Sequence, residues 1–170
     1  MIYQILKKAY YETYLSIPNK LKIPALVVFI ISVVLIILQF NEISTELNMN
    51  VFAIVSDPFL DSENSGNFRW VAQDMYNELV DILFITSGLM LAFTKEKVED
   101  EMITLIRYKS LVNTTYIIFI LVIISELLIY GMSFGYVIMF FYYVFIILLN
   151  TIYYTKLFIY KKQFSYENED

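Results

Sequence analysis

Four long apolar stretches constrain this chain more than any other feature of its sequence. They cover residues 23–40, 77–94, 111–130 and 134–154. Each holds about 17–21 residues, and at about 1.5 Å per residue a helix of that length crosses the roughly 30 Å hydrocarbon core of a bilayer. Residues 117–124 and 137–149 are apolar on every face, unlike the one-sided helices of soluble domains. The sequence therefore predicts an all-α fold, a four-helix transmembrane bundle.

The composition agrees with a membrane protein and excludes most enzyme classes. Hydrophobic residues make up 59% of the chain and charged residues 17%, whereas soluble domains hold about 45–50% apolar and about 25% charged residues. The chain has neither Cys nor His, which excludes disulfides, zinc sites built on these residues and every mechanism that needs an imidazole. We therefore predict no enzymatic activity, no cofactor, no metal and no small-molecule substrate.

The basic residues are distributed unevenly between the predicted loops. Eleven of the twelve Lys and Arg residues lie in three segments on one side of the predicted topology: 1–22, 95–110 and 155–170. The twelfth, Arg69, lies in the acidic first loop, 41–76. Because cytoplasmic loops of membrane proteins are enriched in Lys and Arg, we predict that both termini are cytoplasmic and that the first loop and the short turn 131–133 lie outside. No dense basic patch indicates nucleic-acid binding.

The segments outside the predicted spans have weaker patterns. Residues 1–17 place apolar side chains on one helical face, which predicts an N-terminal amphipathic helix on the inner leaflet; a frayed tail is the alternative. In the first loop, residues 50–55 form a short extended run. The spacing of Phe68, Val71 and Met75 is helical and predicts that the second membrane helix begins near Phe68, about two turns outside the bilayer.

Small and polar residues recur within the apolar spans, several of them at heptad spacing. Membrane helices pack through small residues and hydrogen-bonding side chains, because lipid itself offers no hydrophobic drive for association. These positions therefore predict the inward faces of the bundle. The predicted packing residues are Ser32, Gly88, Ala92, Tyr143 and Asn150.

Two carboxylates lie inside predicted spans, where charged side chains are rare and often functional. Asp81 follows the outer end of the second span, and Glu126 precedes the outer end of the third. Three interpretations remain open. The pair holds the bundle together by hydrogen bonds, forms an ion or proton site that becomes a cation-selective ring in an oligomer, or receives a helix of another protein.

The second loop, 95–110, combines charge with an apolar face. Val98, Met102, Leu105 and Ile106 share one helical face, acidic residues precede it and Arg107 follows. This pattern predicts a short amphipathic helix that lies along the membrane or docks a cytoplasmic partner; a charged connector that only caps two helices is the alternative. The candidate partner-binding residues are Val98, Glu99, Asp100, Glu101, Met102, Leu105 and Arg107.

The same loop carries a family resemblance. The run Lys95-Glu96-Lys97-Val98-Glu99-Asp100-Glu101-Met102-Ile103, followed by Leu105-Ile106-Arg107-Tyr108-Lys109-Ser110, resembles a recurring loop in small uncharacterised bacterial four-span membrane proteins. The likeness lies mainly within residues 95–160. It implies a bacterial cytoplasmic-membrane protein and brings no activity, ligand or functional residue.

Two classes of function remain for such a chain. The first is an accessory or regulatory membrane protein that assembles with itself or with a protein partner through the second loop or the outer segment. The second is a homo-oligomeric channel or membrane-permeabilising effector that uses Asp81 and Glu126. The lipid bilayer is the one partner that both classes require.

Overall fold

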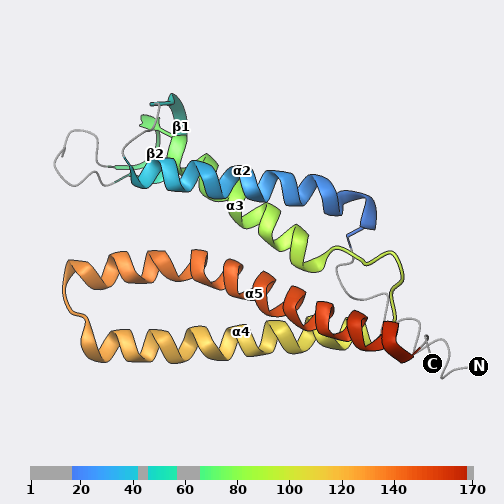
Figure 1. Cartoon of the computed structure of the whole chain (residues 1–170). Helices are drawn as coiled ribbons and strands as arrows, with labels where there is room; N and C mark the ends of the chain where they lie inside the picture. The colour runs from blue at the N-terminus through green and yellow to red at the C-terminus, as the bar shows by residue number, and fades with distance from the viewer. Residues whose placement is uncertain (1–16, 42–45, 57–65, 168–170) are drawn as a thin grey trace, which may run out of the picture. The chain divides into compact units, whose positions relative to one another are not determined.

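The computed structural model describes residues 17–41, 46–56 and 66–167. The predicted N-terminal amphipathic helix lies almost entirely outside the described residues. The elements follow one another along the chain as shown in Figure 1: η1 (Asn19–Leu21), α2 (Lys22–Phe40), β1 (Asn48–Ser56), β2 (Gly66–Asp74), α3 (Tyr76–Phe93), α4 (Glu101–Leu128) and α5 (Met132–Glu167). The chain is therefore mostly helical, as predicted, but it is not all-α, because it contains a two-stranded sheet.

Among the residues that the structure describes, four helices are long and apolar enough to cross a membrane. These are Asn19–Phe40, Tyr76–Phe93, Glu101–Leu128 and Met132–Gln163. Each coincides with one predicted apolar stretch, and their length and composition confirm the expectation of a membrane protein. The side chains on these helices are largely exposed in the single chain, as expected where lipid replaces water as the solvent.

The last two helices are longer than a bilayer requires. α4 has 28 residues and α5 has 36, which gives lengths of about 42 Å and about 54 Å against a hydrocarbon core of roughly 30 Å. A connection of only Ile129–Gly131 joins them. Because this connection holds one pair of ends together, we expect the excess of both helices at the other end, where α4 begins and α5 ends.

The prediction of a helix from Phe68 onward is wrong. The structure places Phe68 in β2, which pairs antiparallel with β1, with Val51 opposite Val71 and Phe52 opposite Trp70. Residues 68–71 are aromatic, basic and β-branched, a composition that suits a strand. The apparent helical spacing arose because it runs from β2 across Met75 into α3, which begins at Tyr76. Residues 50–55 lie in β1, as the extended run predicted.

The described residues form two units, and the first comprises residues 29–84. Within it, the rings of Phe29 and Phe84 stack with centroids 5.3 Å apart. The Asp74 carboxylate fixes the exit of the hairpin, because its Oδ1 accepts hydrogen bonds from the backbone N–H of Leu47 (2.9 Å) and of Tyr76 (3.1 Å). One side chain thus ties the start of β1 to the start of α3.

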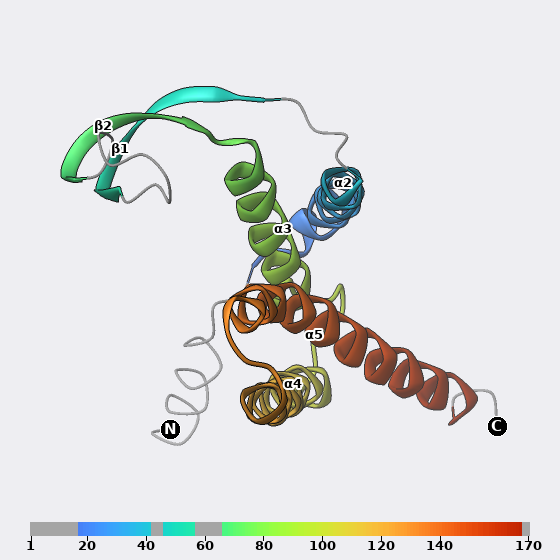
Figure 2. The same ribbon diagram turned by 90° about the vertical axis from the view of Figure 1, so that its left-hand side faces the viewer.

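The second unit comprises the described residues up to 28 and from 85 onward. In it, α4 and α5 run antiparallel (Figures 1 and 2). Near the start of α4 they share a buried cluster of Ile103, Tyr153 and Leu157. The end of α3 joins α5 through polar contacts: Asn150 Nδ2 donates to the Gly88 carbonyl (3.0 Å), and the Tyr154 hydroxyl donates to the Leu91 carbonyl (3.1 Å). These contacts position the α3–α4 connection.

Candidate functional site

The α3–α4 connection is anchored to the segment that precedes α2. The Lys95 backbone N–H donates to the Ile17 carbonyl (2.9 Å), and Asn19 Nδ2 donates to the Lys95 carbonyl (2.6 Å). Thr94 is 1% exposed and its hydroxyl donates to the Met90 carbonyl. These bonds hold the connection in one conformation at the point where its charged residues begin.

Glu96 is a buried carboxylate shared by two lysines. Its Oε1 pairs with Lys22 Nζ, and its Oε2 accepts from Lys161 Nζ at 2.8 Å. The Glu96 side chain is 6% exposed, against 26% for Lys22 and 54% for Lys161. Burial alone would raise the pKa of Glu96, but the hydrogen bonds and charges of Lys161 and Lys22 outweigh it and hold that pKa below its ordinary value of 4.5.

Arg107 on α4 forms a second group of polar contacts in this region. Its Nη1 donates to Glu99 Oε1 at 2.7 Å, and its Nη2 donates to the Thr94 carbonyl (3.1 Å) and to the Tyr153 hydroxyl (3.2 Å). The guanidinium carbon also lies 5.4 Å from the centre of the Tyr153 ring, within the range of cation–π attraction. Arg107 thus joins the connection, α4 and α5 through one planar group.

Asp100 determines where α4 begins. Its Oδ1 accepts from the Ile103 N–H at 2.7 Å, as an N-cap residue does, and its Oδ2 accepts from the Tyr160 hydroxyl at 2.7 Å. The helix that starts at Glu101 continues to Leu128 without interruption. The predicted separate amphipathic helix is therefore the first part of α4.

We call the ionic groups of this region the junction cluster: Lys22, Glu96, Glu99, Arg107 and Lys161. Sequence reasoning placed Glu99 and Arg107 in a partner-binding loop, but it missed Glu96, Lys22 and Lys161 as members of a site. The lysines had been used only to orient the chain. No local pattern marks Glu96, because its partners are 74 and 65 residues away in the sequence.

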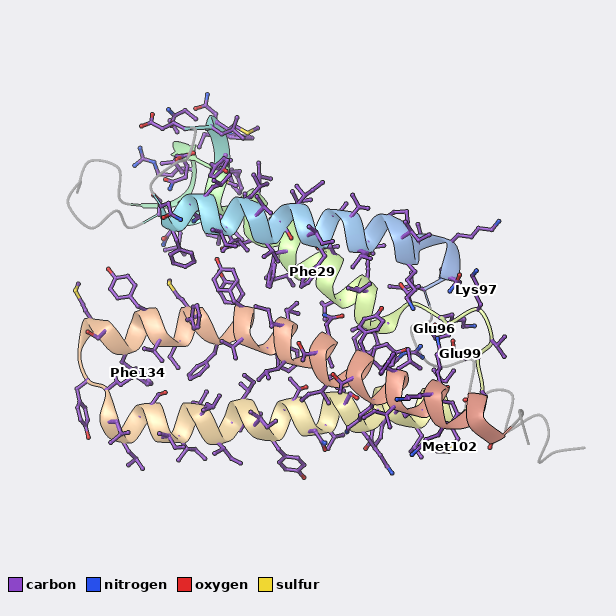
Figure 3. The ribbon with its side chains drawn as sticks, in the orientation of Figure 1. Phe29, Glu96, Lys97, Glu99, Met102 and Phe134 are labelled. Carbon is purple, nitrogen blue, oxygen red and sulfur yellow. The ribbon has the colours of Figure 1, made fainter. Side chains whose placement is uncertain are left out.

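The predicted partner-binding residues fall into two groups in the structure. Glu99, Asp100 and Arg107 have intramolecular partners, and Glu101 lies exposed in the first turn of α4. The apolar members remain exposed: Val98 is 78% exposed, Met102 48% and Leu105 40%. Figure 3 shows Glu96 and Glu99 in the connection and Met102 at the start of α4. The charges of this loop therefore hold it in place, while its apolar side chains are available for contacts.

The predicted packing residues are mostly buried. Ser32 is fully buried and its hydroxyl donates to the Phe29 carbonyl at 2.8 Å. Ala92 is 1% exposed, and Gly88 is bonded to Asn150 as described above. Tyr143 is half-buried and packs against the ring of Tyr142 at 4.0 Å between centroids. Ser32, Gly88, Ala92 and Asn150 are thus buried, whereas the half-buried Tyr143 packs against its neighbour on α5, Tyr142.

The two carboxylates within the predicted spans, Asp81 and Glu126, belong to different units. Asp81 is half-buried in the unit of residues 29–84, and Glu126 is exposed in the other unit. Glu126 lies in the last turn of α4, two residues before the helix ends at Leu128. Within the described ranges, no group of three or more His, Cys, Asp and Glu residues is arranged to hold a metal ion.

Comparisons with protein-family models, with curated proteins and with solved structures give no significant match. The resemblance of residues 95–160 to small bacterial four-span membrane proteins therefore stays a prediction.

Proposed function

We propose that this protein is a small accessory or regulatory membrane protein that works by assembling with itself or with a protein partner. The observation that carries the proposal is the exposed apolar strip of Met102 and Leu105 on the first turns of α4, the helix that carries Arg107 of the junction cluster. Binding costs less conformational entropy when the backbone that carries the contacting side chains is already ordered before the partner binds. The ion pair of Glu99 and Arg107 orders the backbone of this segment in this way.

The position of the strip also favours a protein over lipid as its partner. Asp100, Glu101, Arg107 and Lys109 surround it in the sequence, and charged side chains are unfavourable in the hydrocarbon core of a bilayer. The basic residues of this end predict that it faces the cytoplasm, with both termini on the same side, and the resemblance of residues 95–160 implies a bacterial inner membrane. A cytoplasmic or membrane protein with an apolar surface would bury the strip.

Site-specific photocrosslinking tests the proposal. A photoreactive side chain at Met102 should give a discrete crosslinked product in native membranes, and Leu105→Asp should abolish that product. The matched control carries the photoreactive group at Tyr116, which is exposed further along α4. Subunit counting by native mass spectrometry in lipid nanodiscs then separates self-assembly from a different partner. Lipid adducts alone at Met102 would refute the proposal.

A homo-oligomeric channel is the second candidate, and the exposure of Glu126 supports it. A carboxylate on the lipid-facing side of a membrane helix is unfavourable unless water or another subunit covers it. A ring of several copies would provide that cover and would line a cation path. Glu126→Gln should then reduce cation flux through liposomes that contain the protein, whereas unchanged flux would exclude this role of Glu126.

A further inference from the structure

A pocket with a cationic lining lies beside the buried Glu96. It has a volume of 390 Å³ and is lined by Asn19, Lys22, Ile23, Glu96, Lys97, Val98 and Lys161. Three lysines face one carboxylate in this lining, so the pocket carries a formal charge of +2. An anion is therefore the favoured occupant.

Glu96 orients the lysines without satisfying them. Both of its carboxylate oxygens are engaged, one by Lys22 and one by Lys161, while each ammonium group has three N–H donors. Lys22 Nζ also lies 5.1 Å from the centre of the Tyr154 ring. The N–H donors of Lys22 and Lys161 that these contacts leave open can bind oxygen atoms of a ligand. Lys97 is exposed and adds a third cation outside these two ion pairs.

The rim of the pocket is apolar and continuous with the membrane helices. Ile23 is 74% exposed and Val98 is 78% exposed. Lys22 is the first residue of α2, and Glu96 follows the end of α3 by three residues. The pocket thus lies at the polar ends of two apolar helices, α2 and α3. In a bilayer, such ends lie at the level of the lipid headgroups.

We propose that this pocket binds the phosphate group of an anionic amphiphile, with the phosphate near Lys22, Lys97 and Lys161 and an acyl chain over Ile23 and Val98. Basic pockets at the ends of membrane helices recognise acidic lipid headgroups in this way. A soluble phosphate compound has the same anionic group but lacks the chain that the apolar rim would contact. The proposal does not depend on the protein partner proposed above.

Native mass spectrometry of the full chain tests the site. The protein in a neutral detergent is titrated with phosphatidylglycerol, with phosphatidylcholine and, separately, with inorganic phosphate. We expect selective binding of phosphatidylglycerol. Lys97→Gln should weaken that binding about fivefold, because one lysine near a lipid headgroup contributes about that factor. Lys97 makes neither ion pair of Glu96, so this variant should fold normally.

Lys95→Gln is the matched control, because Lys95 is exposed, lies two residues away and does not line the pocket. Its effect should be less than twofold. Binding of inorganic phosphate that is sensitive to Lys97→Gln but not to Lys95→Gln would support the anion site and assign it to a soluble ligand. Equal losses in the two variants, or equal binding of phosphatidylglycerol and phosphatidylcholine, would overturn the proposal.

Discussion

Replacing Glu96 by Gln tests whether the junction cluster holds the α3–α4 connection in place. The substitution keeps the size of the side chain and removes the charge that Lys22 and Lys161 share. The amide of glutamine offers one acceptor instead of two and turns N–H donors toward the lysines. We expect the connection to open more often, while the helices remain intact.

The loss of stability expected for Glu96→Gln follows from the solvent exposure of Lys22 and Lys161. A hydrogen bond to a charged group contributes about 1.5–3 kcal/mol when it is largely shielded from water. The Lys22 side chain is 26% exposed and falls near the lower end of that range, whereas Lys161 is 54% exposed and contributes about 0–1 kcal/mol. The loss should therefore total about 2 kcal/mol of local opening free energy, which corresponds to about 30-fold faster amide exchange.

Hydrogen exchange with mass spectrometry measures this effect at two informative amides. The Lys95 N–H is bonded to the Ile17 carbonyl and the Glu96 N–H to Glu99 Oε2, so both report opening of the connection. Glu126→Gln is the matched control, because it makes the same chemical change at the opposite end of α4. Exchange in Glu96→Gln within about threefold of wild type, or a larger effect of Lys161→Gln than of Lys22→Gln, would refute the assignment.

Four further predictions, one of them with Gly135→Ala as its paired control, concern a charge, a turn, a helix contact and a ring pair. Acid should reproduce the Glu96→Gln effect: the folded pKa of Glu96 lies below its ordinary value of 4.5, so its stabilising contribution is complete above that pH and is lost as the pH falls through the folded pKa. The ratio of amide exchange rates between Glu96→Gln and wild type should thus shrink below that pH. Gly131→Ala should lower the thermal midpoint by an amount equivalent to about 1–2 kcal/mol, because Gly131 has φ +73°. Gly135→Ala, in α5 with open space around its Cα, should instead raise the midpoint. Asn150→Leu should destabilise the chain by only about 0.6 kcal/mol in denaturant titrations in bicelles, since hydrogen bonds between membrane helices contribute little on average; a loss above about 2 kcal/mol would contradict that reasoning. Phe52→Ala should weaken the near-ultraviolet circular dichroism of Trp70, because the two rings form an edge-to-face pair 5.6 Å apart.

The membrane helices were predictable because length and uniform apolarity are local properties of the sequence. The hairpin was only half predictable. Residues 50–55 are recognisable as a strand because they form a short extended run. Val71, Met75 and Leu79, however, have a helical spacing that spans the boundary between β2 and α3. Periodicity alone cannot find such a boundary. Asp74 does mark it, through its bonds to the N–H groups of Leu47 and Tyr76, but any Asp before an apolar run has the same local appearance.

The site was less predictable than the fold, because its groups come from distant parts of the chain. The charged and apolar residues of 98–107 were recognisable as an amphipathic segment. Val98, Met102 and Leu105 are exposed, whereas Ile103 is buried and Ile106 packs against its cluster. Nothing in that segment distinguishes Glu99, which pairs within the chain, from a solvent-exposed acid. The burial of Glu96 depends on Lys22 and Lys161, and their proximity is a property of the fold.

The positions of the charges along α4 and α5 locate the junction cluster relative to the bilayer. Residues 110–125 of α4 and 132–155 of α5 contain no charged side chain, and they measure about 24 Å and about 36 Å as helices. The charge-free stretch of α4 is about 6 Å shorter than the roughly 30 Å apolar core, so a bilayer centred on this stretch reaches the charged residues at both of its ends. Arg107 then lies near one interface and Glu126 near the other. Glu126 at an interface can reach water without a pore, so its exposure alone supports a channel less strongly than an equally exposed carboxylate at the centre of the helix would.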